Sequence, residues 1–218
     1  MYDMHSHSNH SDDSSTPMLL MVQSAIDKGL QGIAVTDHYD PDYPTPEFDF
    51  LPDFKKYQEE MESLERKFSK DIQVIRGLEI GIQHGDTLKK CKDAASSYPY
   101  DFLIGSFHCA LGKDLYVDYF DQLPLEESYH RFYQYMANCL SEYDDFDVLG
   151  HLNIIDRYAP EIPPENLFFD EIQSILRLLT ERGQGVEINT SSFRYNLGDT
   201  TTPTRKILET YRSIGGEI

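Results

Sequence analysis

The sequence alternates six times between short apolar stretches and longer amphipathic ones. Apolar stretches such as GIAVTDH (32–38) and DFLIGSFH (101–108) have the length and composition of buried strands. The segments between them repeat apolar residues at helical spacing. This alternation predicts an α/β fold with a parallel, barrel-like sheet. The predicted strands cover residues 1–4, 32–38, 72–82, 101–108, 147–152 and 185–190, and the predicted helices cover 17–30, 50–68, 87–97, 125–143, 169–183 and 202–216.

The length of the chain, 218 residues, fits one sizeable domain, so we expect a single domain over residues 1–218. The final residues, Gly216, Glu217 and Ile218, resemble the beginning of a further strand. We therefore expect a barrel that is truncated at the start of its seventh strand, with unpaired edges on either side of the gap.

Composition excludes several classes of partner. The net charge of −19 argues against a nucleic acid held by a basic surface. No apolar run approaches the roughly 20 residues that cross a bilayer, so no membrane partner is expected. The three cysteines are odd in number and lack a CxxC spacing, which is typical of reduced thiols in a cytoplasmic protein. The oligomeric state is left open.

Residues that commonly bind metals follow or lie within nearly every predicted strand. His5 and His7 are two positions apart, so in an extended chain both point to the same side. The strand ends of a parallel barrel share one face, so these residues would converge there. Each histidine taken singly is more often structural, and the N-terminal group alone also fits a solvated terminus. Together they predict a multinuclear metal centre. Its candidate residues from strand position are His5, His7, His38, Glu79, His108, His151, Glu187 and Asn189.

The candidate ligands are histidines and carboxylates without cysteine, a set that suits zinc, manganese or iron. Glu79 lies within an apolar strand, where a carboxylate is costly without a cation. We expect Asp37 to orient the neighbouring His38 rather than to bind metal. Three further histidines are left outside the site: His10, His84 and His130.

The ordered set HSH, SDD, TDH, an isolated Glu, SFH and GH resembles the polymerase and histidinol phosphatase (PHP) superfamily over essentially the whole chain. Within it, four stretches resemble the bacterial histidinol-phosphatase branch, namely YDPDYPTPEFDF, GLEIGIQ, DVLGHLNIIDRY and GVEINTSSFR. The resemblance implies a distorted (β/α)7 barrel with parallel strands and two to three divalent metal ions.

The resemblance also implies a role for each ligand. His5 and His7 would bind a first ion, and Glu79 would bridge it to a second ion completed by His108 and His151. Asp12 and His38 would hold a third. The family's last motif, which carries a further Asp and His ligand on the seventh strand, would come after Ile218. A chain ending there is expected to have lower activity and to hold the third ion less tightly.

The activity implied is hydrolysis of a phosphomonoester, histidinol phosphate, by a metal-bridging hydroxide. Arg194 and Arg157 are the candidate phosphate ligands, with Arg194 preferred because it lies nearer its strand end. The segment Tyr39 to Phe50 is either a lid over the substrate or a structural insertion. Two alternatives remain: a related enzyme that acts on another phosphoester such as a nucleotide, and a non-catalytic metal-binding domain.

Overall fold

The structure is a computed structural model that describes residues 1–121, 123–195, 197–198 and 200–217. The chain forms two compact units, each with its own elements. Unit 1 contains Met1–Gly81 and Lys89–Ile104, and unit 2 contains Ile82–Leu88 and Gly105–Ile218.

The sheet of unit 1 is parallel. Strand β1 (Tyr2–Asp3) pairs with β2 (Gly32–Val35), and β2 pairs with the long strand β4 (Gln73–Gly81). A short strand, β3 (His38–Tyr39), continues beyond β2 and also pairs with β4. Its register places His38 directly opposite Glu79, so the pairing itself brings two predicted ligands together.

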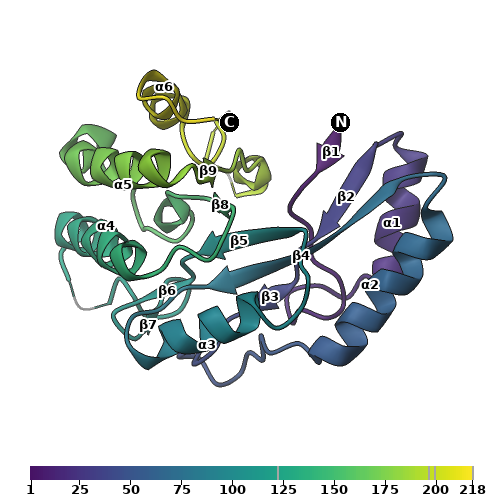
Figure 1. The fold of residues 1–218 in the computed structure, drawn as a ribbon. Coiled ribbons are helices and arrows are strands. Elements are labelled where there is room, and N and C mark those ends of the chain that lie inside the picture. Colours follow the sequence, from purple (N-terminus) through teal and green to yellow (C-terminus); the bar gives the residue numbers. More distant parts are fainter. Residues whose placement is uncertain (122, 196, 199, 218) are drawn as a thin grey trace. The chain divides into compact units, whose positions relative to one another are not determined.

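Two helices of unit 1, α1 (Met18–Asp27) and α2 (Phe54–Phe68), pack on each other and on β2 and β4, as Figure 1 shows. The predicted apolar stripe of α2 is confirmed, since Tyr57, Met61 and Leu64 are buried. The Tyr57 hydroxyl lies 3.0 Å from the Val35 carbonyl oxygen and accepts a hydrogen bond from the backbone N–H of Asp37. This helix therefore braces the segment that carries Asp37 and His38.

Unit 2 combines a small parallel pair with a row of helices. Strand β8 (Val148–Leu149) pairs with β9 (Gly185–Val186), and an antiparallel hairpin joins β6 (Cys109–Ala110) to β7 (Lys113–Asp114). Helices α4 (Leu125–Glu142), α5 (Phe169–Arg182) and α6 (Arg205–Ser213) lie side by side in that order (Figure 1). Three 3-10 turns complete it: η1 (Ile154–Arg157), η2 (Glu165–Leu167) and η3 (Ser191–Arg194).

Two elements contribute residues to both units: helix α3 (Asp86–Ala95) and strand β5 (Phe102–Ser106). With them, the six predicted helices and six predicted strands are all present, and the α/β class with parallel strands is confirmed. Helix α5 ends, as its sequence indicates, at Gly183 in the left-handed conformation. The expectation of a single domain stays a prediction.

Some boundaries differ from the sequence expectation. Strands β8 and β9 have only two residues each, so His151 and Glu187 lie just beyond them. The strand expected over residues 32–38 is divided into β2 and β3, and strands β6 and β7 were not expected. Residues 216–218 were expected to begin a seventh strand; Gly216 and Glu217 adopt no strand conformation, and Ile218 lies outside the described residues. Among the described residues, no helix combines the length and apolar character needed to cross a bilayer.

Candidate metal centre

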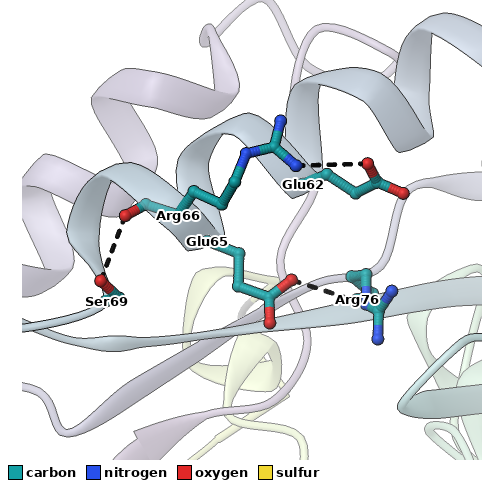
Figure 2. A pocket seen from close by; sticks show the side chains of 5 residues that line it. All are labelled: Glu62, Glu65, Arg66, Ser69 and Arg76. Atoms are coloured by element: carbon teal, nitrogen blue, oxygen red, sulfur yellow. Dashed lines mark hydrogen bonds and ion pairs between the residues drawn. The ribbon is translucent and has the colours of Figure 1, made fainter.

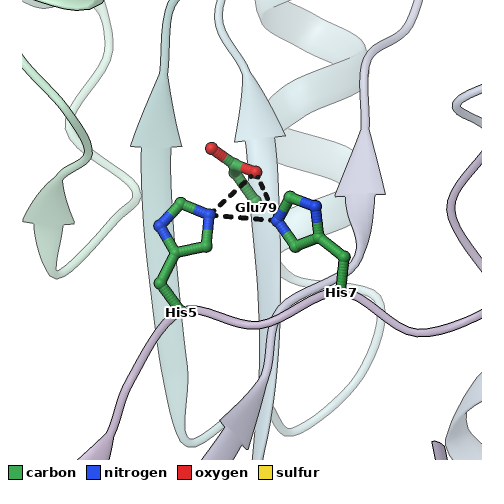
Figure 3. A group of neighbouring side chains, drawn as sticks. All are labelled: His5, His7 and Glu79. Carbon is green, nitrogen blue, oxygen red and sulfur yellow. Dashed lines mark hydrogen bonds and ion pairs between the residues drawn. The ribbon is translucent and has the colours of Figure 1, made fainter. Parts of the chain in front are cut away.

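Three predicted ligands of unit 1, His5, His7 and Glu79, point at one another (Figure 3). The Nε2 atoms of His5 and His7 are 3.0 Å apart. Oxygen Oε2 of Glu79 lies 3.2 Å from Nε2 of His5 and 3.0 Å from Nε2 of His7. The Glu79 side chain is completely buried, whereas the two imidazoles are 13% and 15% exposed. Solvent therefore reaches the two imidazoles but not the carboxylate of Glu79.

The spacing of these three atoms fits a divalent metal ion. Nitrogen and oxygen ligands about 2.0–2.1 Å from a tetrahedral ion lie about 3.3 Å from one another. The observed separations of 3.0–3.2 Å are close to that value. A cation would also balance the buried carboxylate charge of Glu79, which is costly in an apolar surrounding. His5, His7 and Glu79 therefore form a suitable site for a divalent ion.

A second group in unit 1 consists of His7, Asp13 and His38. Oxygen Oδ2 of Asp13 lies 2.8 Å from Nδ1 of His7 and 3.7 Å from Nε2 of His38. Burial alone would raise the pKa of Asp13, but hydrogen bonds with His38 and His7 outweigh it and hold that pKa below its ordinary value. Asp13 is therefore a carboxylate at neutral pH, as a metal ligand must be.

Asp12, the residue named by the family resemblance, lies elsewhere. Its Oδ2 atom accepts a hydrogen bond of 2.6 Å from the backbone N–H of Asp49, so it fastens the loop before α2. The assignment of Asp12 as a ligand stays a prediction, while the geometry favours its neighbour. Sequence reasoning missed Asp13 because the pair SDD offers two adjacent carboxylates and no periodicity distinguishes them.

Two aspartates near His38 support the site, and it is Asp40, not the expected Asp37, that contacts the His38 ring. The Asp37 carboxylate accepts hydrogen bonds from the N–H and hydroxyl of Ser8, at 2.6 and 2.7 Å, so it fixes the N-terminal loop instead of orienting His38. Burial raises the pKa of Asp37. Asp40 makes the contact expected of Asp37, with Oδ2 2.9 Å from Nδ1 of His38. This contact directs Nε2 of His38 toward Asp13.

The segment after His38 is packed against that histidine. The ring of Phe50 lies 4.7 Å from the His38 ring and stacks on Phe48 at 5.7 Å. The backbone N–H of Asp40 donates to the Phe50 carbonyl oxygen at 3.0 Å. These contacts favour the structural reading of the insertion around Phe50, and its role as a lid stays a prediction.

Unit 2 contains the remaining predicted site residues. The rings of His108 and His151 are 5.4 Å apart. Arg157 lies in η1, where its Nη2 donates to the Ser191 hydroxyl at 2.7 Å and its guanidinium lies 4.1 Å from the centre of the Tyr195 ring. Arg194 lies in η3 and is exposed. Arg157 is thus held in place by several contacts, although sequence position favoured Arg194.

The three histidines left outside the predicted centre each contact a glutamate. His10 lies 3.0 Å from Glu60, His84 lies 3.1 Å from Glu142, and His130 lies 2.6 Å from Glu171. Each partner is a single carboxylate, and none of the three histidines belongs to a group of metal-ligand atoms among the described residues.

The surface of unit 1 also has a pocket of about 460 Å³, lined by residues of α2 and β4 and by Ser69 (Figure 2). Its arginines already face carboxylates: Arg66 lies 3.5 Å from Glu62, and Arg76 lies 3.8 Å from Glu65 and 3.1 Å from Asp101. Because these charges cancel and no histidine lines the pocket, we do not assign the chemistry to it.

Comparison with known proteins identifies the family of the chain. The family model described as "PHP domain" matches residues 3–191. A "Probable histidinol-phosphatase" of Clostridium acetobutylicum is 30% identical over 226 residues, covering 100% of this chain and 83% of that protein. The "Histidinol-phosphatase" of Lactococcus lactis is 29% identical and is covered over 72% of its length, with 88% of this chain aligned.

Solved structures are also similar. The histidinol phosphate phosphatase of Lactococcus lactis, complexed with zinc, L-histidinol and phosphate, matches with a TM-score of 0.89 and 26% identity, over 100% of this chain and 82% of that one. A structure from Listeria monocytogenes matches with a TM-score of 0.82 over 98% of this chain and 91% of that one, and at 16% identity it supports the fold alone. The chain therefore belongs to the PHP domain family, in its histidinol-phosphatase-like branch.

Proposed function

We propose that this chain is a metal-dependent phosphomonoesterase that hydrolyses histidinol phosphate to histidinol and phosphate. The observation that carries the proposal is the group of His5, His7 and Glu79, in a chain that matches over its full length a phosphatase solved with zinc, L-histidinol and phosphate. The cytoplasm is the proposed location, supported by the odd cysteine count.

Two to three divalent ions, zinc, manganese or iron, are part of the proposal. His5, His7 and Glu79 would hold one, and His7, Asp13 and His38 provide a second set of ligand atoms. The bridging role of Glu79 toward an ion bound by His108 and His151 remains a prediction from the family resemblance. Bound divalent ions lower the pKa of water and neutralise charge on phosphoryl oxygens.

The residues of the chain contribute by position and charge. In the reaction a water oxygen attacks phosphorus, the bond from phosphorus to the histidinol oxygen breaks, and that oxygen takes up a proton. The contact of Asp40 with Nδ1 of His38 fixes the orientation of that imidazole, with Nε2 facing Asp13. The hydrogen bonds from Ser8 to Asp37 hold the loop of His5 and His7 in place before substrate arrives.

Arg157 is the proposed main phosphate ligand, with Arg194 as a second. A guanidinium matches phosphate oxygens with a planar fork of N–H donors. Its contacts with Ser191 and Tyr195 fix the plane of the Arg157 fork, which reduces the entropy lost on binding. Arg157→Ala is therefore expected to raise KM more than Arg194→Ala does. Unchanged KM in Arg157→Ala would return the main role to Arg194.

The substrate is tested with a panel of phosphoesters. Purified protein with added manganese or zinc is given histidinol phosphate, a nucleoside monophosphate and an oligonucleotide, and released phosphate is measured. We expect the highest kcat/KM for histidinol phosphate and no cleavage of the oligonucleotide, because a charge of −19 repels polynucleotides. Preference for the nucleotide would support another phosphoesterase activity, and metal binding without turnover on any substrate would support a non-catalytic domain.

A further inference from the structure

A chain of hydrogen bonds within unit 2 connects His151 to Arg157. The backbone N–H of His151 donates to Glu187 Oε2 at 2.9 Å, and Asn189 Nδ2 donates to the other carboxylate oxygen, Oε1, at 3.1 Å. Asn189 Oδ1 in turn accepts from the backbone N–H of Ser191 at 2.8 Å, and the Ser191 hydroxyl accepts from Arg157 Nη2 at 2.7 Å. The side chains of Glu187, Asn189 and Ser191 thus link His151 to Arg157 through an unbroken series of hydrogen bonds.

The backbone after β9 explains why these three side chains line up. The N–H of Glu187 donates to the Leu149 carbonyl oxygen at 3.1 Å, and Asn189 exchanges two hydrogen bonds of 2.9 Å with Thr202. This segment is therefore extended, so alternate residues project to the same side. Glu187 and Asn189 follow that alternation, and Ser191 begins the η3 turn at the next alternate position.

The two residues at the ends of this hydrogen-bond series, His151 and Arg157, are each held by it. His151 has a φ of 22°, which is uncommon for a residue with a Cβ atom and must be imposed by its surroundings. The Glu187 carboxylate holds the N–H of that peptide with a charge-assisted hydrogen bond. At the other end, Arg157 lies over the Tyr195 ring, and its hydrogen bond to Ser191 fixes the direction of its N–H donors.

We propose that Glu187, Asn189 and Ser191 are positioning residues that fix the His151 backbone and the Arg157 guanidinium in one common frame. The inference rests on the proposed function for the roles of the two ends, His151 toward a metal ion and Arg157 toward phosphate. A change at Ser191 then acts on phosphate through Arg157, and a change at Glu187 acts on metal through His151.

The Ser191 end is tested by binding of inorganic phosphate to manganese-loaded protein, measured by calorimetry. Ser191→Ala is expected to weaken phosphate roughly tenfold, since a hydrogen bond to a charged group is lost. Ser191→Thr keeps the hydroxyl and is expected to restore most of the affinity. In an Arg157→Met background the loss caused by Ser191→Ala is expected to disappear, because coupled residues are not additive.

Ser192→Ala is the matched control. Ser192 is the next residue, but its hydroxyl donates to the Thr200 carbonyl oxygen and makes no contact with Arg157 in the described contacts. Phosphate affinity is expected to stay unchanged in this variant. An equal loss in Ser192→Ala would mean that disturbing the turn is sufficient, and would overturn the role of Ser191.

The Glu187 end is tested by manganese affinity, measured by competition with a chelator. Glu187→Gln is expected to weaken manganese roughly tenfold, whereas Ser191→Ala leaves it unchanged. Should Glu187→Gln fail to fold, as judged by circular dichroism, Asn189→Asp places a second carboxylate against Glu187 and is expected to give the same loss. Unchanged manganese affinity in the folded variant would overturn the proposal.

These experiments distinguish failure of the positioning role from failure of the proposed function. A protein that shows both couplings but does not hydrolyse histidinol phosphate would refute the substrate and leave the positioning role intact. Equal effects of Ser191→Ala with and without Arg157, or manganese-loaded unmodified protein that binds no phosphate, would overturn the positioning role itself.

Discussion

Glu79 is the residue on which the metal site depends most. Its carboxylate is completely buried and lies within 3.2 Å of two imidazole nitrogens, so it carries most of the negative charge available to an ion there. Neutral histidines contribute a lone pair without charge, whereas a carboxylate contributes both. Removing the charge of Glu79 should therefore cost more than removing one imidazole.

We predict that Glu79→Gln lowers bound metal more than His5→Ala or His7→Ala does. The measurement is elemental analysis of the purified variants after identical dialysis against manganese or zinc. Glu62→Gln, which changes an exposed glutamate of α2, serves as the control and should keep the full metal content. Equal losses in all three site variants would argue against a dominant, bridging Glu79.

Asp12 and Asp13 allow a direct comparison of two adjacent carboxylates. Asp13→Asn is expected to lower metal affinity by about tenfold or more, because it removes the negative charge that faces His7 and His38. Asp12→Asn should mainly loosen the loop at Asp49. Both variants are compared by chelator competition, and a larger loss in Asp12→Asn would restore the assignment that the family resemblance implies.

At the scale of elements, the η1 turn carries Arg157 and is anchored by a half-buried aspartate, Asp156. Asp156 accepts hydrogen bonds from the Tyr129 hydroxyl at 2.9 Å and from Asn153 Nδ2 at 2.6 Å. Burial nevertheless raises the pKa of Asp156 above its ordinary value, because the hydrogen bonds compensate only in part. Folding therefore favours the protonated form of this carboxyl group.

The sign of the pH effect follows. The contribution of Asp156 to stability is fully present below the ordinary aspartate pKa of 3.8 and is lost as pH rises through the raised value of the folded state. We predict that the free energy of unfolding of Asp156→Asn, relative to the unmodified protein, increases from pH 4 to pH 7. Urea unfolding at both pH values is the measurement, and a difference independent of pH would contradict the raised pKa.

The element order could be predicted from sequence because hydrophobic periodicity reflects burial, and burial decides where strands and helices form. The apolar stripe of α2 and the glycine at the end of α5 are examples. Side-chain direction within polar loops could not be predicted, because no periodicity constrains it. This is why Asp13 and Asp40 were missed and why Asp37 was assigned to His38 instead of Ser8.

The candidate ligands likewise include some that the sequence pattern could predict and some contacts that it could not. His5, His7 and Glu79 were predictable because two are on one side of an extended segment and the third is a charge within an apolar strand. The hydrogen-bonded path from His151 to Arg157 includes a contact between residues 36 positions apart and another between residues 34 apart, which sequence spacing does not encode.

At the scale of the whole molecule, the high negative charge and the buried ligand groups both favour the metal-bound state. A ligand that binds only the folded protein stabilises it by about 2.7 kcal/mol at a concentration 100 times its dissociation constant. We predict a stabilisation of this size when manganese is added to metal-depleted protein, measured by urea unfolding. The Glu79→Gln variant should gain much less, and an equal gain would place the ion elsewhere.

The central claim is that hydrolysis of histidinol phosphate requires metal held by this group of histidines and carboxylates. The most direct test is kcat/KM for histidinol phosphate, measured for metal-depleted protein and again after reconstitution with manganese or zinc. The account predicts negligible turnover after depletion and recovery on reconstitution, with no recovery in Glu79→Gln. Full turnover by the depleted protein, or full recovery in Glu79→Gln, would contradict it.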